Sequence, residues 1–239
     1  MLLELKGVSK RFGAVVAADA IDLSVAEGVA LGIIGANGAG KSSLFNLIAG
    51  VLKPDAGTIT LDGRDITRLP ARGRCRAGIG RSFQIPRPFE SLSVFENLLV
   101  AAQFGSREPR SVAYCVDLLE RTGLRGKADT VAGRLTLLDR KRLELARALS
   151  TRPRLLLLDE IAGGLTEAEC GELITLIRAL HAEGITIVWI EHIVNALLSV
   201  VSELVVLEFG KMIAGGAPRE VMAMPEVRRS YLGIGEAAA

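Results

Sequence analysis

Eight residues near the start of the chain have the types and spacing of a loop that binds nucleotide phosphates. They are Gly35, Ala36, Asn37, Gly38, Ala39, Gly40, Lys41 and Ser42, and they fit the pattern G-x-x-x-x-G-K-[ST]. Small side chains let successive backbone N–H groups converge on one anion. Lys41 can add a point charge to the terminal phosphates, and the Ser42 hydroxyl can ligate Mg²⁺. The pattern predicts phosphate binding.

The segments on either side of this loop predict the elements that position it. Residues 29–34 form an apolar run typical of a short buried strand, and residues 43–49, which begin at Ser43, have apolar side chains at helical spacing. The helix would point the positive end of its dipole at the phosphates. A glycine-rich turn that binds nothing is the alternative, and this strand, loop and helix context disfavours it.

Two carboxylates and a histidine follow two further apolar runs. Asp159 and Glu160 come directly after four leucines, and His192 comes shortly after the run at 185–190. We expect Asp159 to hold Mg²⁺ through its water shell and Glu160 to polarise the attacking water as a general base. His192 would reach the γ-phosphate from the same edge of the sheet. Solvated acids and a structural histidine are the alternatives, and the matching strand-end positions favour the site.

Composition limits the class of protein. With 239 residues, 49% hydrophobic, and a net charge of +2, the chain is typical of one ordered domain without the basic excess of a duplex-binding protein. We find no apolar run long enough to cross a bilayer and no signal-peptide pattern, so we expect a cytosolic protein. Cys75, Cys115 and Cys170 lie far apart, which favours small buried side chains over a disulfide or a metal cluster.

The order of patterns along the chain predicts an α/β fold with a mostly parallel sheet flanked by helices. Strand patterns at 3–5, 21–25 and 58–61, the last followed by the turn dipeptide Asp62-Gly63, indicate a small antiparallel sheet. Helical patterns at 94–102, 112–121 and 140–149 indicate a helical insert. A capping box at Thr166 and Glu169 begins a helix that ends at Gly184, and an alanine-rich tail follows Gly233.

Taken in order, these residues resemble the ATP-binding subunits of ABC transporters over essentially the whole chain. The resemblance implies ATP and Mg²⁺, with Ser42, Gln84 and Asp159 around the metal and Ser43 completing the phosphate site. It also implies that Phe12 stacks on adenine, that Gln84 links the metal and the water to membrane subunits, and that His192 is the switch histidine. The implied architecture is a P-loop NTPase core with an antiparallel subdomain (1–84 and 152–239) and a helical subdomain (85–151).

Residues 79–89, 93–101, 215–221 and 231–233 are similar to the LivG branch, which powers importers of branched-chain and related amino acids. The implied partners are a LivF-like second ATPase subunit or a second copy, two permease subunits and, indirectly, a solute-binding protein. The implied location is the inner face of the cell membrane. Residues 85–89 and the helical insert are the candidates for contact with a permease coupling helix.

One family motif is altered. Thr136, Leu137, Leu138 and Asp139 stand where the family signature has a hydroxyl residue, glycine and glutamine, whereas the following 142–149 is faithful. Leu138 fills a glycine position, and Asp139, the expected cap of a helix from Arg140, adds negative charge where the signature meets the γ-phosphate of the other subunit. We expect an impaired opposite site, although Thr136 could still donate and make the change tolerable. The hypothesis that follows is a heterodimer whose partner has an intact signature.

Three other functions compete. A soluble ABC protein of DNA repair or translation would need a long coiled-coil insert or a second cassette, and a lipopolysaccharide-export ATPase would keep its signature glycines. A nucleotide-binding subunit without turnover is the third, and Glu160 argues against it. The arginines between Arg64 and Arg87 are expected to be a solvated face, with contact to anionic lipid as the alternative.

Overall fold

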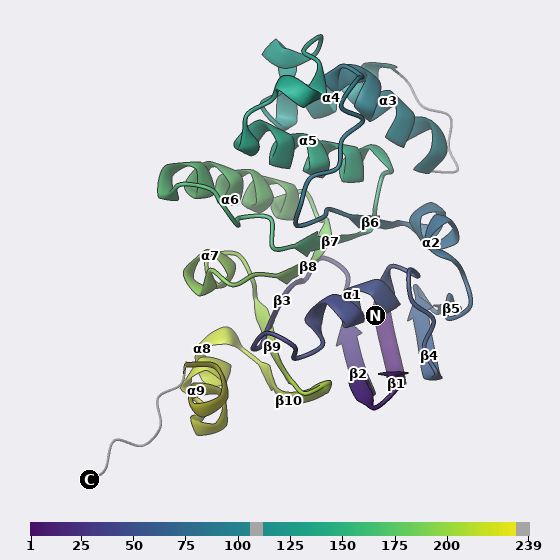
Figure 1. Ribbon diagram of the computed structural model, residues 1–239, viewed down its shortest axis with the longest axis vertical. Coiled ribbons are helices and arrows are strands. Elements are labelled where there is room, and N and C mark those ends of the chain that lie inside the picture. Colours follow the sequence, from purple (N-terminus) through teal and green to yellow (C-terminus); the bar gives the residue numbers. More distant parts are fainter. Residues whose placement is uncertain (106–111, 233–239) are drawn as a thin grey trace.

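The computed structural model describes residues 1–105 and 112–232, and it is built on two sheets (Figure 1). The larger sheet has the strand order β10-β9-β3-β8-β7-β6 and is parallel except for β10. Its strands are β3 (Ala30–Ile34), β6 (Ile79–Arg81), β7 (Leu155–Asp159), β8 (Thr186–Ile190), β9 (Glu203–Glu208) and β10 (Lys211–Gly216). The predicted, mostly parallel sheet is confirmed.

The smaller sheet is antiparallel, as predicted, with the order β2-β1-β4-β5. Its strands are β1 (Leu3–Phe12), β2 (Val15–Val25), β4 (Ala56–Leu61) and β5 (Arg64–Asp65). Asp62 and Gly63 form the tight turn between β4 and β5, with φ of 50° and 70°. Strands β1 and β2 are longer than predicted because irregular register obscures the alternation of side chains around Gly7, whose φ is 58°.

Helices cover both faces of the larger sheet (Figure 1). The helical insert contains α3 (Val94–Gly105), α4 (Val112–Arg121) and α5 (Leu137–Ser150), with two 3₁₀ turns at Arg125–Lys127 and Ala132–Arg134. The others are α1 (Lys41–Ile48), α2 (Ala71–Ala77), α6 (Glu167–Ala182), α7 (Val194–Leu198), α8 (Pro218–Ala223) and α9 (Pro225–Leu232). The division of the chain into two subdomains at 85 and 151 stays a prediction, and the tail after Gly233 lies outside the described residues.

The start of α5 corrects the sequence-based prediction. The helix begins at Leu137 rather than Arg140, and its N-cap is Thr136 rather than Asp139. The Thr136 hydroxyl accepts a hydrogen bond from the backbone N–H of Asp139, so the residue types at the altered signature favour an earlier helix start. The predicted capping box of α6 at Thr166 and Glu169 is confirmed.

Alternate side chains of the central strands enter two separate apolar cores. Leu156 and Leu158 pack with the helical insert and α6, whereas Leu155 and Leu157 pack with α1 and the smaller sheet. A parallel strand covered on both faces needs such an unbroken apolar run. As a result, β3, β7 and β8 are fixed from both sides, and their carboxyl ends reach the same edge of the sheet.

Cys115 and Cys170 are buried as predicted, while Cys75 is half-buried and donates to the carbonyl of Gly105 at 3.3 Å. No helix of the described residues is both long enough and apolar enough to cross a bilayer.

Candidate nucleotide site

The phosphate loop follows β3 and leads into α1, and its glycines are required by close backbone contacts. A Cβ atom on Gly40, where φ is 105°, would lie 2.4 Å from the carbonyl oxygen of Ala17. A Cβ atom on Gly35 would lie 2.3 Å from the carbonyl oxygen of Leu207. Both positions exclude any side chain, so the loop can adopt its compact curve only with glycine there.

Lys41, the first residue of α1, is buried with its charge turned into the loop. Its Nζ donates to the carbonyl oxygens of Gly35 at 2.7 Å and Ala36 at 3.1 Å. Burial lowers the pKa of Lys41, and the charges of Glu160 and Asp159 partly oppose that shift. A desolvated cation enclosed by the loop is suited to an anionic partner, because it gains more from one than a hydrated surface lysine would.

A cavity of about 310 Å³ joins the phosphate loop to the end of β1. Its walls combine loop backbone, hydroxyls and an aromatic ring, and include Phe12, Asn37, Gly38, Ala39, Lys41, Ser42, Ser43 and Glu160. The ring of Phe12 is 47% exposed, with the Lys10 ammonium 5.6 Å from its centroid. An exposed ring at one end and converging amides at the other fit a base and its phosphates.

Glu160 brings the three predicted catalytic residues together. Its carboxylate accepts a hydrogen bond from Gln84 Nε2 at 2.5 Å and lies 2.8 Å from His192 Nε2. Its backbone has a φ of 46°, rare for a residue with a side chain, and its N–H donates to the carbonyl of Ile190 at 2.8 Å. Backbone strain of this kind gathers at functional sites, where the surroundings enforce it.

Asp159 is held by an arginine whose role the sequence analysis missed. Arg81 Nη2 lies 2.7 Å from Asp159 Oδ2, and Arg81 Nη1 donates to Asn46 Oδ1 at 2.6 Å. The available signal was the position of Arg81 at the end of a strand that neighbours β7. Ser42, Gln84 and Asp159 offer the hydroxyl, amide and carboxylate oxygens that Mg²⁺ accepts, so this donor set fits the ion chemically.

The segment after Gln84 is fastened to one face of α5. Lys141 Nζ donates to the carbonyl of Gln84 at 3.1 Å, and Arg147 Nη1 donates to the carbonyl of Arg87 at 2.7 Å. Between them, Glu144 accepts from the backbone N–H of Arg87 at 3.3 Å. Burial raises the pKa of Glu144, while the charge of Arg147 and hydrogen bonds oppose the shift. We call these three side chains the α5 row.

Within the altered signature Leu137 is exposed, whereas the polar groups of Thr136 and Asp139 are paired within the chain. Asp139 is 3% exposed and forms ion pairs with Lys127 and, at 3.7 Å, with Arg142. Burial pushes the pKa of Asp139 upward, but hydrogen bonds from Lys127 and Thr136 and the two positive charges outweigh it and lower the pKa. Leu138 is buried in the core of the helical insert. We call residues 136–139, at the start of α5, the tip. The negative charge of Asp139 at the tip is thus compensated within the chain.

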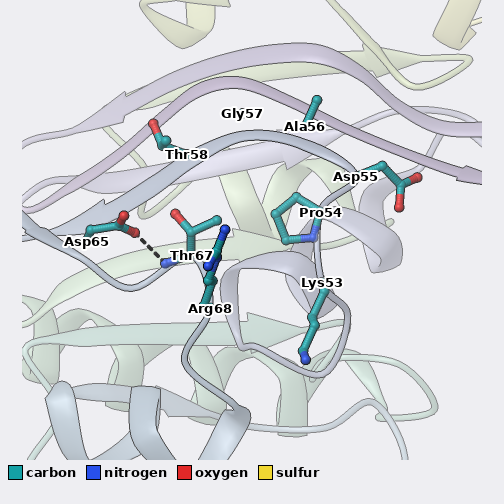
Figure 2. A pocket seen from close by; sticks show the side chains of 9 residues that line it. All are labelled: Lys53, Pro54, Asp55, Ala56, Gly57, Thr58, Asp65, Thr67 and Arg68. Atoms are coloured by element: carbon teal, nitrogen blue, oxygen red, sulfur yellow. Dashed lines mark hydrogen bonds between the residues drawn. The ribbon is translucent and has the colours of Figure 1, made fainter.

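A second cavity, of about 610 Å³, lies at the edge of the smaller sheet (Figure 2). Lys53, Asp55, Asp65 and Arg68 line it, and Asp65 accepts from the backbone N–H of Thr67 at 2.7 Å. None of the predicted site residues lies there. Despite its greater volume, this cavity lacks the loop and carboxylate chemistry of the nucleotide site.

A nucleotide-hydrolysing α/β cassette is the class that this fold and site define, and comparisons with known proteins give the family. Residues 18–163 match the ABC transporter family. The chain is 36% identical to the branched-chain amino acid transport ATP-binding protein BraF of Pseudomonas aeruginosa, covering 97% of this chain and 98% of that protein. LivG of Salmonella typhimurium gives the same figures, and the lipopolysaccharide export protein LptB of Acidithiobacillus ferridurans is 35% identical with 97% of each chain covered.

Solved structures agree with this. A nucleotide-free ATP-binding cassette of an ABC transporter has a TM-score of 0.88 at 31% identity, covering 98% of this chain and 99% of that one. A cassette solved in its ADP conformation has a TM-score of 0.88 at 32% identity, covering 97% and 98%. The chain belongs to the ABC transporter family of ATP-binding subunits. It is therefore a nucleotide-binding protein and an ATPase.

Proposed function

We propose that this chain is the ATP-hydrolysing subunit of an importer for branched-chain or related amino acids, and that Glu160 is its general base. The carrying observation is the position of Glu160, on the wall of the phosphate-loop cavity and held between Gln84 and His192. The solute class is supported by the identity to BraF and LivG along nearly the whole length of each. LptB is almost as similar, so the solute needs its own test.

Each residue has a distinct task in this proposal. The phosphate loop, with Lys41, Ser42 and Ser43, binds the phosphates, and Phe12 stacks on the base. Ser42, Gln84 and Asp159 would hold Mg²⁺, and the ion would supply positive charge that neutralises the phosphates. Glu160 accepts the proton of the attacking water, and His192 orients the Glu160 carboxylate and contacts the terminal phosphate.

Replacing Glu160 with Gln tests the assigned role. The amide keeps the size of the side chain but cannot accept the proton of the attacking water, so ATP turnover should fall by about a hundredfold or more while ATP stays bound. Turnover of the assembled transporter and retention of radiolabelled ATP are the measurements. Unchanged turnover would show that another group is the base.

A groove next to the Gln84 segment is our candidate for the permease contact. It has a volume of about 280 Å³, lies between α2, α3 and α5, and is lined by Ala71, Cys75, Phe83, Ala101 and Arg147 among others. Phe83, which lines the groove, and Ile85 and Phe89 in the segment that follows are large exposed apolar side chains. Such a groove suits a short amphipathic helix, here the coupling helix of a membrane subunit at the inner face of the membrane. This keeps residues 85–89 as the proposed contact.

We further propose that the second ATPase subunit is a LivF-like protein with an intact signature. The support is the start of α5, where Thr136 and Asp139 bind each other and Leu138 is buried, which leaves little free to contact a phosphate across a dimer interface. With such a partner, ATP turnover should exceed that of this chain alone by about tenfold or more. The reason is that hydrogen-bond donors of an intact signature stabilise the negative charge that develops on the phosphate in the transition state. Equal rates for the chain alone and for the heterodimer would contradict the asymmetry.

To identify the solute, permease and binding-protein genes adjacent to this one can be expressed together with it. ATP turnover in vesicles should then be stimulated by the binding protein loaded with leucine, isoleucine or valine. Stimulation by lipopolysaccharide instead would favour the export function.

A further inference from the structure

Glu191 is a fully buried carboxylate that the assigned site does not use. It follows β8, is 1% exposed, and accepts hydrogen bonds on both oxygens. Oε2 accepts from the backbone N–H of Ala162 at 3.2 Å and from the indole of Trp189 at 3.3 Å, and Oε1 accepts from the backbone N–H of His192 at 3.2 Å. Burying an acid is costly unless its oxygens are bonded, and these N–H groups, together with that of Ile193, provide such bonds.

Two of these donors belong to the loops that hold the site together. Ala162 lies two residues after Glu160 on the loop that leaves β7, and His192 lies next to Glu191 on the loop that leaves β8. The same two loops meet again in front of Glu191, where His192 Nε2 lies 2.8 Å from Glu160 Oε1. The Glu191 carboxylate thus binds the backbones of both loops, and the side chains of Glu160 and His192 from the same loops contact each other.

We propose that Glu191 is a positioning residue that fixes the loop of Glu160 against the loop of His192, and this inference rests on the proposed function. An acid is needed because all of its hydrogen-bond partners are donors: a carboxylate accepts from each, whereas an amide would turn its own NH₂ group toward an N–H. Lys141 on helix α5 is a buried cation that interacts electrostatically with Glu191. Its Nζ also donates to the Gln84 carbonyl. In the alternative role, Glu191 only accepts hydrogen bonds from backbone N–H groups at the end of β8. Its replacement would then lower stability without changing catalysis.

Kinetics of Glu191→Gln separate these roles. We expect kcat for ATP to fall about tenfold to a hundredfold, with KM and nucleotide affinity changed by less than about twofold, because the carboxylate orients the reacting side chains but does not touch the nucleotide. Glu191→Asp keeps the charge but is too short to reach both loops, and should lower kcat as well. Wild-type kcat in both variants would overturn the proposal.

A matched control lies on the same strand. Thr186 begins β8 at its opposite end, is fully buried, and accepts a hydrogen bond from the backbone N–H of Gly28 at 2.8 Å. Thr186→Val removes one buried hydrogen bond far from the site. It should lower the melting temperature without lowering kcat, and an equal loss of kcat at equal destabilisation would assign Glu191 a purely structural role.

The histidines give a readout that does not depend on turnover. The chain has two, His181 and His192, so imidazole NMR signals of the isolated full chain can be assigned by substituting one. In Glu191→Gln the His192 signals should shift, while those of His181, whose Nδ1 lies 3.2 Å from the carbonyl oxygen of Ile185, stay fixed. Unshifted His192 signals contradict the inference. Absent turnover in the wild-type transporter would instead contradict the proposed function.

Discussion

The starts of α1 and α5 point to opposite uses of a helix amino terminus. Helix α1 begins after Gly40, with no side-chain cap and no acidic residue in its first turn, within the described residues. Helix α5 begins after Thr136, whose hydroxyl takes the backbone N–H of Asp139, and Asp139 places a carboxylate in the first turn. Both ends carry the same partial positive charge, but only α1 leaves it for a ligand.

A helix can be retained while its binding end is lost. The start of α5 now matches the capped start of α6, where Thr166 accepts from the Glu169 N–H at the same 3.3 Å. Because Lys127 and Arg142 neutralise Asp139, repulsion of a phosphate is not the main consequence of the changed residues. The consequence is that two donors at this helix end, the Thr136 hydroxyl and the Asp139 N–H, are already engaged with each other's residue.

The largest effect is expected at the start of α1. Lys41→Ala removes the buried cation, and a hydrogen bond to a charged group is worth about 1.5–3 kcal/mol, so ATP affinity should fall about tenfold to a hundredfold by calorimetric titration. Lys53→Ala, which removes an exposed lysine from the other cavity, is the control and should bind normally. Normal binding by both variants would remove the contrast between the two helix starts.

A smaller effect should depend on pH. Asp139→Asn removes the charge held by Lys127 and Arg142 and should lower the free energy of unfolding by about 1–2 kcal/mol at pH 7. Because folding lowers the pKa of Asp139, its contribution is present above about pH 4 and is lost as the pH falls through the folded-state pKa. Urea unfolding from pH 7 to 3 should therefore bring the two proteins together, and a gap independent of pH would refute the ion pair. Asp129→Asn, at an exposed aspartate, is the control.

The smallest effect is expected from removing the threonine caps of α5 and α6. Thr136→Ala and Thr166→Ala should each lower the free energy of unfolding by about 1 kcal/mol, measured by urea denaturation. Only Thr136→Ala should also change turnover with the second ATPase subunit, because α5 faces that subunit in the proposal. Identical effects of the two changes on turnover would place the tip outside the interface.

Local patterns predicted the parts of the molecule that depend on local geometry. The phosphate loop, the apolar strands before Asp159 and Glu191, and the capping box at Thr166 all follow from residues close in sequence. The contacts that the analysis missed join distant segments: Arg81 reaches Asp159 from a neighbouring strand. The start of α5 was predicted wrongly for another reason. Thr136 and Asp139 are both residue types that cap helices well, and only the hydrogen bonds between them show that Thr136 is the cap.

The α5 row has a consequence for how freely the chain can diverge. Helix α5 has 14 residues, a rod of about 20 Å, and its tip lies at one end while Lys141, Glu144 and Arg147 hold the Gln84 segment along its length. The contacts of the α5 row with the Gln84 segment do not involve the residues at the start of the helix. We therefore expect substitutions at the start of α5 to leave these contacts in place, whereas a substitution in the α5 row would loosen the Gln84 segment even beside an intact signature.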